Sequence, residues 1–154
     1  MIGVVRFLYL LALGVWVGEI VCFSFIVAPA VFAVLGPVRA GGVVAAIFPR
    51  YYALGAAAAG SALVCGAVLR RATPSGWWTA ALLCIALGLA ASLWSWTVVH
   101  PRAQQRRTEL EAAGETPSGD AAFRRLHGTA VALNGAALLA GVVGLGLSAG
   151  ALRQ

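Results

Sequence analysis

Long apolar segments that carry few charged residues are the feature that most constrains how this chain can fold. Four of them follow one another, at about residues 4–33, 52–69, 77–99 and 120–148. A helix needs about 20 apolar residues to cross the hydrocarbon core of a bilayer, where only helices and closed barrels satisfy the backbone polar groups. We therefore predict an all-α, four-helix transmembrane bundle that forms a single integral membrane domain over residues 1–154.

Composition and charge favour the same class. Hydrophobic residues make up 61% of the chain and charged residues 10%, against about 25% charged residues in soluble domains. The formal net charge is +6, and all 11 basic residues are arginines. They lie at or near the ends of the apolar segments, which is typical of topology signals and does not indicate nucleic-acid binding. The predicted partner is the lipid bilayer.

The arginines also predict an orientation. Four lie on the side of the chain termini: Arg6, Arg70, Arg71 and Arg153. Seven lie on the other side: Arg39, Arg50, Arg102, Arg106, Arg107, Arg124 and Arg125. Because cytoplasmic segments carry the excess of positive charge, we predict a multi-pass protein with the long polar loop 101–119 in the cytoplasm and both termini on the opposite side.

The connection between the first two apolar segments is unusual. Residues 37–50 are too short, and too interrupted by glycine and proline, to span a membrane. Arg50 and the adjacent Tyr51 and Tyr52 suit the headgroup level of a bilayer. We predict a short interfacial or re-entrant helix here, between spans one and two.

The polar loop 101–119 predicts a helical extension of the third span that breaks at residues 114–119. Arg107 and Glu111 are four residues apart, so they can form an ion pair on one helix face. Asp120 is a suitable N-cap for the helix that follows.

Small residues recur every four positions in the first span. Gly14, Gly18 and Cys22 form a stripe that lets another helix approach closely. Such a stripe predicts packing within the bundle, a homo-oligomer or attachment to a larger membrane complex. Further along the same span, Pro29 predicts a kink because proline lacks the backbone donor. The three cysteines are isolated in different apolar segments, so no disulfide is expected.

Two polar residues lie deep in apolar segments. Glu19 is near the middle of the first span, where a carboxylate costs about 3 kcal/mol unless it is neutral or partnered. It has either a functional role or a packing role as a protonated group. Asn134, the only asparagine, lies at a similar depth and is the candidate partner of Glu19 in a buried polar contact or a proton-linked pathway.

The two histidines are both predicted near the loop-side surface. His100 ends the third span, and His127 lies about two turns into the last helical segment. Arg50, Tyr51 and Arg124 are expected at the same level. A pocket of this composition could bind an anion, a metal ion through His127 and His100, or haem through paired imidazoles. The alternative for each histidine is a structural hydrogen bond.

The chain lacks the common catalytic signatures. It contains no Ser-His-Asp arrangement, no HExxH, no phosphate-binding loop and no dinucleotide fingerprint. An enzymatic function is therefore not indicated. No cofactor is required, although a metal ion or haem is compatible with the two histidines.

Four sequence blocks together resemble the transmembrane-protein-205-like family. They are Trp16-Val17-Gly18, the run from Ile47 to Tyr52, Pro101-Arg102, and the run from Phe123 to Gly128 with Asn134. The resemblance implies a four-helix membrane protein of largely unknown biochemistry, whose animal members have been associated with platinum-drug resistance and membrane trafficking. The residues that match best are Pro49, Arg50, Tyr51, His127 and Asn134. Glu19 and His100 lie outside the motifs.

Three functional hypotheses follow. The first is a non-enzymatic membrane protein that binds or moves a small solute, ion or metal through the loop-side pocket. The second is a structural or accessory subunit of a larger membrane complex. The third is a haem-binding redox protein that uses His100 and His127.

Overall fold

The computed structural model describes residues 1–153, and no strand occurs among them. The helices, in chain order, are α1 (Ile2–Cys22), the π-helical turn η1 (Phe23–Val27), α2 (Ala28–Ala72), α3 (Gly76–Trp94), the π-helical turn η2 (Ser95–Val99), α4 (His100–Ala112), the short 3-10 helix η3 (Pro117–Gly119) and α5 (Ala121–Leu152). The predicted all-α class is confirmed. Within the described residues, three continuous helical stretches are long and apolar enough to cross a membrane: Ile2–Ala72, Gly76–Ala112 and Ala121–Leu152.

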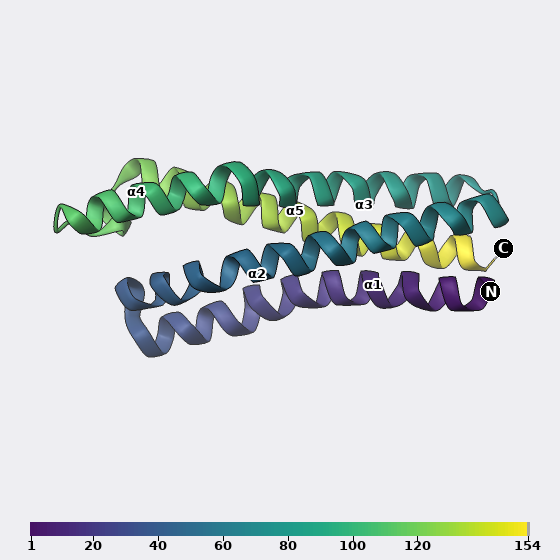
Figure 1. Ribbon diagram of the computed structural model, residues 1–154, viewed down its shortest axis with the longest axis horizontal. Coiled ribbons are helices and arrows are strands. Elements are labelled where there is room, and N and C mark those ends of the chain that lie inside the picture. The colour runs from purple at the N-terminus through teal and green to yellow at the C-terminus, as the bar shows by residue number, and fades with distance from the viewer. Residues whose placement is uncertain (154) are drawn as a thin grey trace.

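The first stretch reverses direction at Gly36. This residue has φ 70° and ψ 166°, a backbone conformation that glycine adopts readily because it has no Cβ. Residues 28–35 continue α1, and residues 37–72 run back beside it, so that α1 and most of α2 form a helical hairpin (Figure 1). Pro37 begins the returning arm, a position where its fixed φ and missing donor cost little.

Residues 37–50 do not form a separate interfacial helix. They are the first part of the returning arm, which continues without interruption to Ala72. Pro49 lies inside this arm, but burial of Ala40 and Val44 on the same arm favours the continuous helix. The returning helix therefore begins before the predicted second span of residues 52–69.

Both π-helical turns precede a proline at the same spacing. In η1 the Ala28 N–H donates to the Phe23 carbonyl, and Pro29 follows directly. In η2 the His100 N–H donates to the Ser95 carbonyl, and Pro101 follows. Because proline lacks an N–H and its ring clashes with the carbonyl four residues back, the extra residue of a π-turn lets the helix continue past it.

The polar loop is largely helical. α4 extends α3 through η2 and ends before Gly114, which has φ 73°. The predicted Arg107–Glu111 ion pair is present, with Nε and Oε1 2.7 Å apart. Asp120 caps α5 as predicted, since its Oδ1 accepts a hydrogen bond of 2.7 Å from the Phe123 N–H.

The core lies between α1, α2, α3 and α5, and α2 packs against both α1 and α3. One face of α1 supplies buried side chains: Tyr9, Leu13, Trp16 and Ile20. Many large apolar side chains on the opposite faces are exposed, as expected for a surface that meets lipid. The Gly14, Gly18 and Cys22 stripe belongs to this outer surface, so it does not serve as a packing face within the chain.

Both chain ends lie at one end of the bundle (Figure 1). The reversal at Gly36 and the turn between α4 and α5 lie at the other end, which we call the loop-side end. The arrangement gives the bundle two chemically different ends with an apolar middle.

Candidate functional site

A chain of hydrogen bonds joins three elements in the apolar part of the bundle. The Tyr51 hydroxyl of α2 donates to Asn134 Oδ1 of α5 at 2.6 Å. Asn134 Nδ2 in turn donates to the Ser24 hydroxyl of η1 at 3.0 Å. The Asn134 amide is thus held by one partner on each side. In an apolar medium such bonds fix the orientation of the amide because water does not compete for it.

Glu19 lies one helical turn before Phe23, whose ring packs 5.0 Å from that of Tyr51. Its Oε1 is seated against Gly55 of α2, at a place where a Cβ on residue 55 would clash with it. Its Oε2 is buried and has no hydrogen-bond partner. Only glycine at position 55 leaves room for this carboxyl group. We call Glu19, Ser24, Tyr51 and Asn134 the intramembrane polar site.

An aromatic cluster adjoins this site on the loop side. Ring centroids lie 5.3 Å apart for Phe23 and Phe48, 5.5 Å for Phe48 and Tyr52, and 5.3 Å for Tyr51 and Tyr52. The Tyr52 hydroxyl also forms a 2.8 Å hydrogen bond with Ser95. Adjacent tyrosines of α2 are therefore tied to both π-turns, Tyr52 directly through Ser95 of η2 and Tyr51 through Asn134 to η1.

The two histidines pack against different aromatic rings. His100 is half-buried and lies edge-on to Phe48 at a centroid distance of 5.1 Å. His127 is exposed and stacks on Phe123 of its own helix at 6.3 Å. Within residues 1–153, no group of three or more His, Cys, Asp or Glu side chains is placed to hold a metal ion.

The arginines of the predicted loop-side pocket serve local structure. Arg50 is exposed and donates to the Ala46 carbonyl of its own helix at 3.4 Å. Arg124 donates to the Gly119 carbonyl at 2.8 Å and so closes the turn before α5. Of the predicted site residues, the structure joins only Tyr51 and Asn134 by a hydrogen bond. Asn134 does not bond to Glu19; its amide bonds to Tyr51 and Ser24.

Comparison with known families places most of this site in a recognised region. A family model described as a domain of unknown function (DUF4149) matches residues 11–112. The chain belongs to the DUF4149 family. No curated protein and no solved structure matches it. The DUF4149 region contains Glu19, Ser24, Tyr51 and His100, whereas Asn134 lies beyond it on α5. The site is thus completed by a helix outside the matched region.

Charged groups gather in the loop-side segment at the end of the DUF4149 match and just after it. Arg106 Nη2 and Asp120 Oδ2 are 2.8 Å apart, and Arg106 Nε donates to Asp120 Oδ1 at 3.1 Å. This bidentate pair, with the Phe123 N–H, lowers the pKa of Asp120 from 3.8 to about 2. The pair joins α4 to the start of α5.

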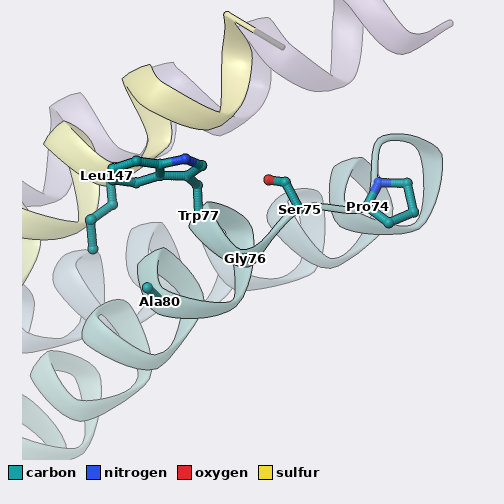
Figure 2. Close-up of a pocket in the computed structure, with 6 residues that line it drawn as sticks. All are labelled: Pro74, Ser75, Gly76, Trp77, Ala80 and Leu147. Carbon is teal, nitrogen blue, oxygen red and sulfur yellow. The ribbon is translucent and has the colours of Figure 1, made fainter.

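A surface depression lies away from the polar site. It has a volume of about 540 Å³ and is lined by Pro74, Ser75, Gly76, Trp77, Ala80 and Leu147 (Figure 2). It is shallow and open, and Trp77 and Leu147 form its apolar side (Figure 2). This depression shares no residue with the intramembrane polar site.

Sequence reasoning missed Ser24, Ser95, Tyr52 and Gly55 as contributors. The available signal was weak for each of them. Ser24 and Ser95 lie five and six residues before a proline, where a π-turn rotates them toward a neighbouring helix. Such an effect cannot be read from residue type alone.

Proposed function

We propose that this chain is a non-enzymatic integral membrane protein that binds a small ion or polar solute at the intramembrane polar site. The observation that carries the proposal is the Tyr51–Asn134–Ser24 hydrogen-bond chain beside a buried, unpartnered Glu19 oxygen. Polar groups at such depth are costly, and in membrane proteins they commonly mark ion or solute sites.

The proposal includes two finer points. Both arms of the hairpin that reverses at Gly36 cross the bilayer, which makes four crossings in all, with the loop-side end in the cytoplasm. The chain is also a transmembrane-protein-205-like protein within its DUF4149 family. Tyr51 and Asn134, two residues of that resemblance, contribute directly to the site.

The test is ligand-induced stabilisation of the detergent-purified protein. Thermal unfolding is measured with sodium, potassium, magnesium, zinc, copper, chloride and phosphate ions, and over a pH series. We expect at least one of these conditions to raise the unfolding temperature of the wild-type protein. Elemental analysis of protein expressed without added metal identifies a metal that remains bound.

Two tyrosine variants make the test specific. Tyr51→Phe and Tyr52→Phe each remove one buried hydroxyl hydrogen bond, so both should lose about 1 kcal/mol of stability. Only Tyr51→Phe breaks the chain to Asn134. We expect Tyr51→Phe to abolish the ligand effect and Tyr52→Phe to retain it. If both variants retained the ligand-induced stabilisation equally, the proposed site would be contradicted.

The pocket of Arg50, Tyr51, His100, Arg124 and His127 has less support as the binding site. Arg124 and His127 are exposed and make separate local contacts. The same comparison tests it, since His127→Ala should leave ligand stabilisation unchanged if Glu19, Ser24, Tyr51 and Asn134 form the site. A haem role has no supporting contact, because His100 and His127 pack on different rings. A haem absorption band in the visible spectrum of the purified protein would support haem binding after all.

A second candidate function is an accessory subunit of a membrane complex. The outward stripe on α1 supports it, since a Cβ added at Gly14 or Gly18 would meet nothing within 4 Å. If the stripe binds a partner, Gly14→Leu with Gly18→Leu should release a stoichiometric companion in mild detergent. Gly146→Leu, at another open position on α5, is the matched control. A homogeneous species without a companion would remove this candidate.

A further inference from the structure

We infer that the ion handled by the intramembrane polar site is the proton, and that the Glu19 carboxyl group carries it and exchanges it with water. This inference rests on the proposed function and narrows its ligand to one chemical class. It starts from the immediate surroundings of the two carboxyl oxygens.

The contacts of Glu19 suit a neutral carboxyl group. Oε1 lies against the Gly55 backbone and Oε2 is buried, and neither oxygen accepts a hydrogen bond among the described residues. An ionised carboxylate normally accepts several hydrogen bonds or faces a cation, because its charge is otherwise uncompensated away from water. A protonated group avoids that cost.

No cation offsets a charge on Glu19. From α2 the carboxyl group faces Gly55 and the nearby Tyr51 phenol, and the Trp16 ring of α1 lies against the same glycine. All ion pairs within residues 1–153 lie in the loop-side segment and involve Arg106 or Arg107. On α2, Arg50 bonds to Ala46, toward the loop-side end.

The same surroundings allow exchange. Glu19 is only half-buried as a residue, so its side chain is not sealed within the core. Neither the depression at the α2–α3 turn nor the one beside Arg70 includes a residue of the intramembrane polar site. A proton needs no cavity, and a carboxyl group without fixed partners can release and rebind one by a rotamer change.

A lipophilic carbodiimide tests the inference. The carboxyl O–H proton moves to a carbodiimide nitrogen while the carboxyl oxygen bonds to the carbodiimide carbon. The resulting acylisourea rearranges to a stable acylurea, and no group leaves. Only a protonated carboxyl group reacts in this way. Wild-type protein in liposomes is treated with dicyclohexylcarbodiimide and examined by intact mass and peptide mapping.

Near pH 7 we expect a single adduct, mapped to Glu19. The other four acidic residues are solvated or paired and serve as internal controls: Glu109, Glu111, Glu115 and Asp120. The labelling rate should fall with rising pH, by about tenfold per pH unit once the carboxyl group ionises. The Glu19→Gln variant should not be labelled. It is a control, because peptide mapping of the wild-type adduct already identifies the labelled residue.

Two outcomes overturn the inference. If Glu19 is labelled only under acidic conditions, like a solvated carboxyl group, it is ionised at neutral pH. If labelling is unchanged to strongly alkaline pH, the group is permanently protonated and only packs helices. Failure of the broader proposal has a different signature, because the Tyr51→Phe variant would then keep every ligand effect whatever the labelling result.

Discussion

At the scale of single residues, the fit between Glu19 and Gly55 is the most demanding contact in the bundle. A Cβ at position 55 would clash with Glu19 Oε1, and it would lie 3.5 Å from the Trp16 ring. The carboxyl group is the movable partner, since it is the end of a flexible side chain. A methyl group there must therefore displace the carboxyl group from its place beside α2.

This contact makes an energetic prediction. Gly55→Ala should destabilise the wild-type protein, by about 1–3 kcal/mol for overpacking at a close helix contact. The loss should be much smaller in a Glu19→Ala background, because the clash is then absent. Thermal unfolding of the double-mutant cycle measures the coupling. Gly60→Ala, where the added methyl meets nothing within 4 Å, controls for helix propensity, and equal losses in both backgrounds would refute the contact.

Asp120 gives a prediction at acidic pH. Its folded-state pKa of about 2 lies below its ordinary value of 3.8, so its contribution to stability is present above about pH 4. That contribution should be lost as pH falls from about 4 to about 2. Asp120→Asn keeps an N-cap acceptor but removes the charge that faces Arg106, so its stability should not show this acid-dependent loss. An unchanged pH profile in the variant would contradict the role of the ion pair.

At the scale of helices, the two π-turns make α1 and α3 longer by one residue each than regular helices over the same path. Each turn begins shortly before a proline and carries a serine whose hydroxyl group hydrogen-bonds to a side chain of another helix. Ser24 bonds to Asn134 of α5, and Ser95 bonds to Tyr52 of α2. The extra residue lets the helical segments before and after the proline keep the same side directed toward the neighbouring helices.

A deletion tests this interpretation. Removing the exposed Thr97 together with Pro101→Ala should convert η2 into regular α-helix with α3 and α4 still in register. Deleting the exposed Leu87 within α3 instead rotates all following residues by about 100° relative to the core. We expect the first variant to fold in detergent and the second to fail. Similar behaviour of both would refute the role of η2.

The limits of sequence prediction appear at this scale. The Asp120 cap and the Arg107–Glu111 pair were predictable because they depend on residues three or four positions apart. The hydrogen-bond partner of Asn134 was not predictable from the sequence. Two residues at the same depth in a membrane meet only if their helices turn the right faces toward each other, and depth does not fix that rotation. Glu19 and Asn134 share a depth, yet Tyr51 and Ser24 occupy the amide. The tight reversal at Gly36 was missed because the glycines and prolines of residues 36–49 predicted an interrupted connection, whereas the returning helix continues through them.

At the scale of the whole molecule, the hairpin gives the bundle a testable orientation. The reversal near Gly36 and the α4–α5 turn lie at one end, and both termini lie at the other (Figure 1). In a variant without native cysteines, Arg39→Cys and Ser118→Cys should react with an impermeant maleimide from one side of the membrane. Gly3→Cys should react only from the opposite side. Labelling of Arg39→Cys together with Gly3→Cys would mean that only one hairpin arm crosses.

The length of the hairpin has a consequence for the membrane itself. The returning arm, residues 37–72, is about 54 Å long as a helix, whereas the hydrocarbon core of a bilayer is about 30 Å thick. The loop-side end of the hairpin exposes apolar side chains on both arms: Phe32, Val34 and Leu35 before Gly36, and Val38 after it. A helix of this length must tilt or locally thicken the bilayer around its end. The free-energy cost of either adjustment falls as the membrane becomes thicker. We therefore expect the protein to partition into thicker bilayers in preference to thinner ones, and to deform a thin bilayer around the hairpin.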